Sequence, residues 1–206
     1  MTPERTEKIK QVINLRQNDL VVVLENVFDP HNIFAVMRTC DAVGVQDLYL
    51  LNTRVNNKMH KSFGKYSSAG AKGWLTIHDY QDTTTCMEAV RKKCDKIYAT
   101  HLGIESKKLY DLNLTERVAL IFGNEKDGVT EDCLKYCDGN FIIPQVGMVQ
   151  SLNISVACAI TLYEAFRQRD IAGFYNGEPR LSILEINKLA LKWKMYDEIQ
   201  KPEMHT

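Results

Sequence analysis

The chain has 206 residues, 45% of them hydrophobic, which is enough for one sizeable core with short extensions at either end. Lysine plus arginine (26) balance aspartate plus glutamate (26), which argues against a protein that coats nucleic acid without sequence preference, although a local basic patch still allows an RNA substrate. No apolar run reaches the length of a membrane span and the polar first residues do not resemble a signal peptide, so a cytoplasmic location is expected.

Apolar runs of strand length alternate with segments of helical spacing along most of the chain. The opening Thr2-Pro3-Glu4 predicts a helix with threonine as its N-cap and proline at its first position. A second helix is predicted to begin with His31-Asn32 as its cap and to end at Gly44. Strands are predicted at residues 20–24, 48–51, 74–77, 96–100, 118–122 and 141–143, and further helices at residues 85–93, 130–137, 153–168 and 183–200. This alternation predicts an α/β fold with a mainly parallel sheet.

One long segment is basic. Residues 51–78 contain no aspartate or glutamate. The cationic side chains in this segment are those of Arg54, Lys58, Lys61, Lys65 and Lys72, and the larger aromatic ones are those of Phe63, Tyr66 and Trp74. Cations for phosphates and flat rings for stacking suit a looped or single-stranded RNA, so Lys58, Lys61 and Lys65 are candidate RNA contacts. A solvated lysine-rich loop whose Trp74 packs into the core explains the pattern equally well.

Three polar loops follow predicted strands, at the edge where an open parallel sheet binds its ligands. The first spans residues 25–32 and leads into the helix that bears Arg38, the second spans residues 122–129, and the third spans residues 143–153. Arg38 lies among apolar residues, where an unpaired cation is costly, and its spacing favours an ion pair with Asp41 over an anionic ligand.

The other two loops also have structural explanations. Asp127-Gly128 is a strong turn dipeptide, which would leave Glu125 merely solvated. Ser151 or Asn153 would cap the helix that follows. The third loop nevertheless offers free main-chain N–H groups at a helix N-terminus, which suit a carboxylate, a phosphate or an oxyanion.

Several common ligand-binding motifs are missing from the sequence. It has no Gly-x-Gly-x-x-Gly of a dinucleotide site, no P-loop and no His-Glu-x-x-His. The six cysteines are scattered and form no Cys-x-x-Cys, which favours reduced, half-buried thiols over disulfides or a zinc site. No metal is therefore expected.

Taken together, the three loops resemble the three motifs of the SpoU branch of the SPOUT methyltransferases, and within it the TrmH subgroup. The matching text is LENVFDPHNIFAVMRTCDAVGV, then LIFGNEKDGV, then IIPQVGMVQSLNISVACAI followed by EAFRQR. A weaker similarity runs from RTEKIKQVINLRQNDL near the start to IAGFY at residues 171–175, so the resemblance covers most of the chain. Agreement in order and spacing makes it far more specific than any single motif.

The resemblance implies a fold, an activity and partners. It implies a SPOUT methyltransferase domain with a C-terminal deep trefoil knot at residues 19–169, between helical extensions at residues 1–18 and 170–206. It implies a homodimer, with each active site completed by the partner, that uses S-adenosylmethionine to methylate a ribose 2′-hydroxyl in tRNA, at guanosine-18 of the D-loop. The matching positions are Thr100, Gly123, Ile143 and Leu152 for the cofactor, Asn32, Arg38, Glu125, Ser151 and Asn153 for catalysis, and Arg167 and Arg169 for tRNA.

The family gives Arg38 the role of activating the hydroxyl. An arginine is hard to deprotonate, so we interpret Arg38 as binding the target's phosphate and stabilising the developing alkoxide, while the proton passes to phosphate or water. Asn32 and Glu125 would orient the guanidinium and the ribose, and Ser151 and Asn153 would shape their loop.

Two alternatives remain open at this point. One is the same chemistry on ribosomal RNA or at another tRNA position, and the other is a non-catalytic RNA-binding protein of the same fold. Several relatives that act on ribosomal RNA carry an extra N-terminal RNA-binding domain, whereas only about one helix precedes the first predicted strand here, which favours tRNA.

Overall fold

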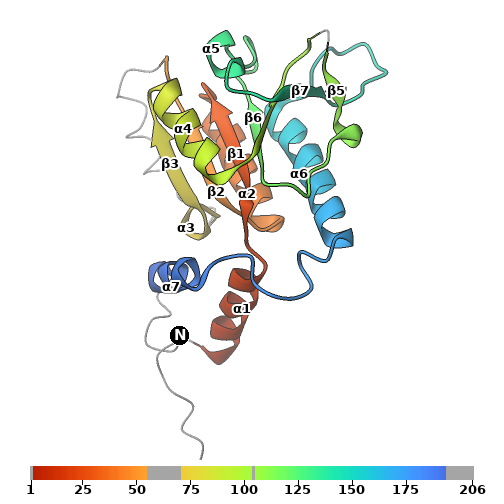
Figure 1. Ribbon diagram of the computed structural model, residues 1–206. Helices are drawn as coiled ribbons and strands as arrows, with labels where there is room; N and C mark the ends of the chain where they lie inside the picture. Colours follow the sequence, from red (N-terminus) through yellow and green to blue (C-terminus); the bar gives the residue numbers. More distant parts are fainter. Residues whose placement is uncertain (1, 55–70, 104, 194–206) are drawn as a thin grey trace, which may run out of the picture.

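The computed structural model describes residues 2–54, 71–103 and 105–193. A sheet of seven parallel strands, in the order β3-β2-β1-β6-β4-β7-β5, forms its centre (Figure 1). The strands are β1 (Gln17–Glu25), β2 (Val45–Leu51), β3 (Thr76–Tyr80), β4 (Lys96–Thr100), β5 (Lys107–Lys108), β6 (Val118–Phe122) and β7 (Gly139–Ile142). The predicted α/β fold with a parallel sheet is therefore confirmed.

Helices cover both faces of this sheet (Figure 1). They are α1 (Pro3–Asn14), α2 (Pro30–Ala42), α3 (Ala71–Trp74), α4 (Thr83–Lys93), α5 (Glu131–Leu134), α6 (Ile154–Ile171) and α7 (Ile183–Lys192), with a 3-10 turn, η2 (Leu109–Asp111). α2 and α6 pack together on one face, and α4 and α5 cover the other. In the described ranges, none of these helices has the length and apolar character needed to cross a membrane.

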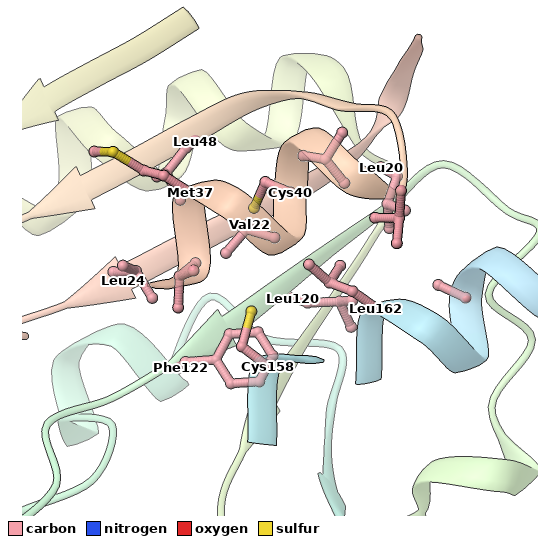
Figure 2. Packing of buried hydrophobic residues seen from close by; sticks show 14 of the residues in the cluster. Leu20, Val22, Leu24, Met37, Cys40, Leu48, Leu120, Phe122, Cys158 and Leu162 are labelled. Atoms are coloured by element: carbon pink, nitrogen blue, oxygen red, sulfur yellow. The ribbon is translucent and has the colours of Figure 1, made fainter. Parts of the chain in front are cut away.

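Alternate residues of the central strands point to opposite faces, which divides the core into two layers. Figure 2 shows the layer in which Val22 and Leu24 of β1 and Leu120 and Phe122 of β6 meet the helices. The helical residues labelled there are Met37 and Cys40 of α2 and Cys158 and Leu162 of α6. Because both faces of β1 are covered, residues 20–24 are at most 1% exposed, which explains their unbroken apolar run.

The beginnings of two elements differ from the sequence predictions. The N-cap of α2 is Asp29, not His31-Asn32, and its carboxylate accepts the main-chain N–H of His31 at 2.9 Å. The proline that follows the cap has no N–H to satisfy, so it suits the first helical position and the helix begins earlier than predicted. Trp74 ends α3 instead of beginning a strand, and β3 starts at Thr76.

Besides α3, two further short elements were missed. β5 consists of two exposed lysines and, among the residues that the structure describes, pairs only with β7; η2 follows it directly. Neither has an apolar period that a sequence could reveal. α5 is also shorter than predicted: Thr130 is its N-cap, the helix ends at Leu134, and Lys135 is its C-cap.

The terminal helices form a small layer of their own, seen at the bottom of Figure 1. Their buried apolar residues are Ile9, Ile13, Leu181, Leu189, Ala190 and Trp193. Arg16 lies fully buried just beyond the end of α1. Its Nη2 atom is 2.5 Å from Oδ1 of Asp41, and its guanidinium lies 5.3 Å from the ring centroid of Trp193. Arg16 therefore joins the terminal layer to the sheet domain.

Buried carboxylates predict that the fold loses stability in acid. Burial opposes ionisation of Asp47 in β2, but contacts of 2.6 Å with His78 and with Lys93 outweigh it and hold the pKa of Asp47 below its usual range. Burial likewise opposes ionisation of Asp19, and Arg169 contributes most to lowering its pKa. Such carboxylates stabilise the fold above their unfolded pKa of about 4, and this stabilisation is lost as the pH falls through the lower folded pKa.

We therefore expect the free energy of unfolding, measured by urea denaturation, to fall as the pH drops below about 4. Asp47→Asn should make this fall shallower, since it removes one of the groups that must be protonated. An Asp47→Asn chain with an unchanged pH dependence would contradict the assignment.

Candidate functional site

A pocket of about 640 Å³ opens at the carboxyl ends of β4, β6 and β7. Residues 100–102, 122–128 and 141–152 provide parts of its wall, together with the first turn of α6. The volume lies within the range of roughly 300–1,000 Å³ that is usual for small-molecule sites. The position is the one at which open parallel sheets bind ligands.

Three polar side chains, from the first turn of α2, the loop after β6 and the N-cap of α6, meet in a row beside this pocket. Asn153 donates from Nδ2 to Oδ1 of Asn32 at 3.1 Å, and Asn32 donates from Nδ2 to Oε1 of Glu125 at 2.6 Å. Asn32 is only 9% exposed, whereas Glu125 is exposed and lines the pocket. The buried amide is bonded at both ends, so it fixes the carboxylate that the pocket presents.

Asn153 also caps α6, as one of the two predicted alternatives stated. Its Oδ1 accepts the main-chain N–H of Ser155 at 2.9 Å. Ser151, the other alternative, lines the pocket instead. One asparagine therefore both begins α6 and holds Asn32, so the structural and functional interpretations of this residue are compatible.

The four positions implied for cofactor binding, Thr100, Gly123, Ile143 and Leu152, all line the pocket. At Gly123 a Cβ atom would lie 2.1 Å from the main-chain carbon of Gly128, so no side chain fits there. Glycine thus lets the two arms of the loop after β6 close on each other.

Arg38 lies elsewhere than the sequence suggested. It is exposed on α2, and Asp41, its expected partner, binds Arg16 instead. Across the described residues, Arg38 has no side-chain hydrogen bond or ion pair, and it is absent from the pocket wall. It follows Asn32 by six residues, roughly 9 Å along the helix axis. The structure therefore joins Asn32, Glu125 and Asn153 but leaves Arg38 as a free surface cation.

The expected tRNA-binding arginines separate into one surface residue and one core residue. Arg167 is exposed and donates to Glu164 at 2.8 Å. Arg169 is fully buried and binds Asp19 at 2.6 Å, so it is not available to RNA in this structure and the expectation for it is corrected. Lys58, Lys61 and Lys65 lie outside the described residues.

Sequence reasoning missed two asparagines next to this site. Nδ2 of Asn124, in the pocket wall, donates to the main-chain carbonyl of Asn26 at 2.8 Å. Asn26 directly follows Glu25, the last residue of β1. Two polar residues in sequence at the end of a buried strand were a signal that could have drawn attention to them.

The six cysteines are free thiols, and all but Cys137 are buried. Burial raises the pKa of the Cys40 thiol to about 12, which leaves it unreactive at neutral pH. No group of three or more histidine, cysteine or acidic residues in the described ranges is placed to hold a metal ion.

These features define a class of protein. An all-parallel α/β sheet presents a ligand-sized pocket at its carboxyl edge, and beside it a carboxylate is held by an amide of α2, which is held in turn by the N-cap amide of α6. This is the arrangement of an enzyme that binds a small molecule at the sheet edge and offers polar groups to a second reactant.

The chain belongs to the SpoU methylase family: the family model described as SpoU rRNA Methylase matches residues 19–163. It is 38% identical over 192 residues to the tRNA (guanosine(18)-2'-O)-methyltransferase of Thermus thermophilus, covering 93% of this chain and 96% of that protein. The corresponding enzyme of Aquifex aeolicus is 37% identical over 198 residues, covering 96% and 92%. The crystal structure of the A. aeolicus TrmH/SpoU tRNA modifying enzyme superposes with a TM-score of 0.79 at 35% identity, covering 96% of this chain and 98% of that one.

Proposed function

We propose that this chain is a tRNA (guanosine-18-2′-O)-methyltransferase that uses S-adenosylmethionine. The observation that carries the proposal is the hydrogen-bonded row of Asn32, Glu125 and Asn153 beside the pocket at the sheet edge. Membership of the SpoU family supports the reaction, and the names of relatives that align along almost their whole length support the substrate.

The pocket suits S-adenosylmethionine in its size and its chemistry. Apolar side chains, among them Phe122, Ile143 and Leu152, offer surface for the adenine, and the loop main chains offer donors and acceptors for its polar edge. The carboxylate of Glu125 provides negative charge on the wall for a cationic ligand. When bound, this cofactor supplies an activated methyl group.

The protein's own side chains orient the acceptor. Asn32 and Glu125 hold the ribose, and Ser151 and Asn153 shape the loop between pocket and α6. Arg38 binds the neighbouring phosphate and stabilises the alkoxide as it develops, and the proton leaves to phosphate or water. Arg38 suits this role because its guanidinium is unpaired within the described chain and exposed.

A homodimer is part of the proposal, with Arg38 entering the site of the partner. Two observations support it. Arg38 is absent from the pocket wall of its own chain. Apolar side chains are also exposed near the pocket: Val146 and Met148 in the loop before α6 are 107% and 99% exposed, and Val156 and Tyr163 of α6 are 45% and 54% exposed. A second copy would remove this surface from water.

Family membership supports the finer parts of the proposal. They are a deep trefoil knot in the C-terminal part of the domain at residues 19–169, helical extensions at residues 1–18 and 170–206, and tRNA contacts from Arg167 and from Lys58, Lys61 and Lys65. A cytoplasmic location is part of the proposal as well, supported by the tRNA substrate proposed above.

Ribosomal RNA is the alternative substrate, in keeping with the description of the family as rRNA methylases. Incubating the purified protein with methyl-labelled S-adenosylmethionine and unmodified tRNA or ribosomal RNA, and mapping the labelled ribose, separates the candidates. We expect label on guanosine-18 of tRNA. Label at another nucleotide or only on ribosomal RNA would overturn the substrate, and cofactor binding without transfer to any RNA would favour a non-catalytic RNA-binding protein.

A further inference from the structure

Two consecutive residues at the end of β1 hold the two ends of the loop that carries Glu125. Glu25 is fully buried, and its carboxylate accepts the main-chain N–H of Thr130 at 2.9 Å and the hydroxyl of Thr130 at 2.5 Å. The main-chain carbonyl of Asn26 accepts the side-chain amide of Asn124 at 2.8 Å. Residues 124–130 are therefore fixed to β1 at both ends.

Asn26 has an unusual backbone. It is the one non-glycine residue with a positive φ, 53°, in the described part of the chain, and it is 1% exposed. Asparagine tolerates this left-handed conformation better than most residues, but such positions persist only where their surroundings enforce them, and they concentrate at functional sites.

The surroundings of Asn26 come from the end of β2. Its Oδ1 accepts the main-chain N–H groups of Thr53 at 2.9 Å and Arg54 at 3.2 Å, and its Nδ2 donates to the hydroxyl of Thr53 at 3.1 Å. The side chain of Arg54 in turn binds Asp127. The segment after β2 is therefore linked to the loop after β6 in two ways: indirectly through Asn26, and directly through the ion pair of Arg54 with Asp127.

Asn124 passes the constraint to the turn that contains Glu125. While its amide donates to Asn26, its Oδ1 accepts the main-chain N–H of Lys126 at 2.9 Å. Its main chain exchanges hydrogen bonds of 3.1 and 2.8 Å with Gly128. Glu125 lies inside this closed turn, so the direction of its carboxylate depends on where Asn124 is held.

We infer that Asn26 is a positioning residue for methyl transfer: through Asn124 it fixes the turn at residues 124–128 so that Glu125 stays bound to Asn32. A continuous series of contacts runs from Thr53 through Asn26 and Asn124 to the turn, and from Glu125 through Asn32 to Asn153. The test of this inference by methyl-transfer activity rests on the proposed function. The effect of Asn26 on the pocket wall does not.

Two substitutions separate the side chain of Asn26 from its backbone and from Asn124. Asn26→Gly keeps the left-handed backbone and the carbonyl but removes the contacts with Thr53 and Arg54. Asn124→Asp keeps the acceptor for Lys126 but can no longer donate to Asn26. Asn113→Asp is a matched control, because Asn113 forms a similar exposed turn, with Oδ1 accepting the N–H of Thr115 at 3.1 Å, away from the pocket.

We expect Asn26→Gly and Asn124→Asp each to lower the single-turnover rate at saturating S-adenosylmethionine and tRNA by about 10- to 100-fold, because a small displacement of a reacting group is costly. The double variant should lose no more than the worse single variant, since both break one series of contacts. Asn26→Gly should lower the melting temperature, because it removes the buried hydrogen bonds to Thr53 and Arg54, but the variant should be folded at the assay temperature. Asn113→Asp should have the wild-type rate.

A rate for Asn26→Gly within twofold of the wild type, or losses that multiply in the double variant, would overturn the inference. If Asn26→Gly fails to fold, Asn124→Asp alone decides. If the wild type transfers no methyl group to tRNA, the proposed function fails, and titration with S-adenosylmethionine then tests the positioning role. The side chain of Asn26 does not itself line the pocket. Weaker binding of S-adenosylmethionine by Asn26→Gly would therefore support the positioning role, and unchanged binding would refute it.

Discussion

Arg38→Ala should lower the rate of methyl transfer to tRNA by about 100- to 1,000-fold, the usual cost of removing a group that stabilises developing negative charge. The fold should be retained, because Arg38 is exposed and has no side-chain partner among the described residues. Surface substitutions of this kind usually change stability by less than about 0.5 kcal/mol. Single-turnover kinetics measures the rate, titration with S-adenosylmethionine measures cofactor binding, and thermal denaturation measures stability. Loss of folding in Arg38→Ala would instead mean a structural role.

A mixed dimer tests whether Arg38 acts in the site of the partner. Arg38→Ala and Glu125→Gln can be co-expressed with different tags, and the heterodimer isolated by two affinity steps. If each site takes Arg38 from one copy and Glu125 from the other, one site of the heterodimer is intact and about half of the wild-type activity returns. A heterodimer as inactive as its parents would place both residues in the same chain's site.

The parts of the fold that depend on local pattern could be predicted from the sequence. The strands at residues 96–100 and 118–122 have the predicted bounds, because each is a short run with apolar residues between polar ones. The position of the site could be predicted from the topology. Parallel strands place their carboxyl ends at one edge of the sheet, so the polar loops after β1, β6 and β7 necessarily converge there. Asn32, Glu125 and Asn153 were all named on that ground or by resemblance, and they do meet.

The parts that depend on contacts between distant residues could not be predicted. Spacing along one helix paired Arg38 with Asp41, but Arg16, 25 residues before Asp41, takes that carboxylate. The resemblance gave Arg169 the same tRNA contact as Arg167, yet the two point in different directions from α6 and only Arg169 enters the core. The positive φ of Asn26 is similarly set by the end of β2 and not by its neighbours in sequence.

Arg169→Ala should be strongly destabilising. Its buried guanidinium donates to Oδ1 of Asp19 at 2.6 Å and to the main-chain carbonyls of Leu114 and Glu116 at 2.9 and 2.6 Å. Alanine would leave these acceptors without their donor and Asp19 with Arg180 as its remaining ion-pair partner. Removing one partner of a buried ion pair typically costs about 3–5 kcal/mol, a large fraction of the stability of a single domain. Urea denaturation followed by circular dichroism measures the loss.

Arg167→Ala is the matched control, since it removes the same side chain two residues earlier on the same helix. Its guanidinium is exposed, and among the described residues it pairs only with Glu164 across one turn. Without it, the buried carboxylate of Glu164 keeps a hydrogen bond of 2.8 Å from the side chain of Gln168. The denaturation midpoint of Arg167→Ala should therefore fall much less than that of Arg169→Ala, while its tRNA affinity falls if Arg167 contacts RNA as proposed. Equal midpoints for the two variants would mean that the buried network around Asp19 does not hold α6 to the sheet. A lower tRNA affinity in Arg169→Ala under conditions where it is fully folded would return that arginine to the RNA surface.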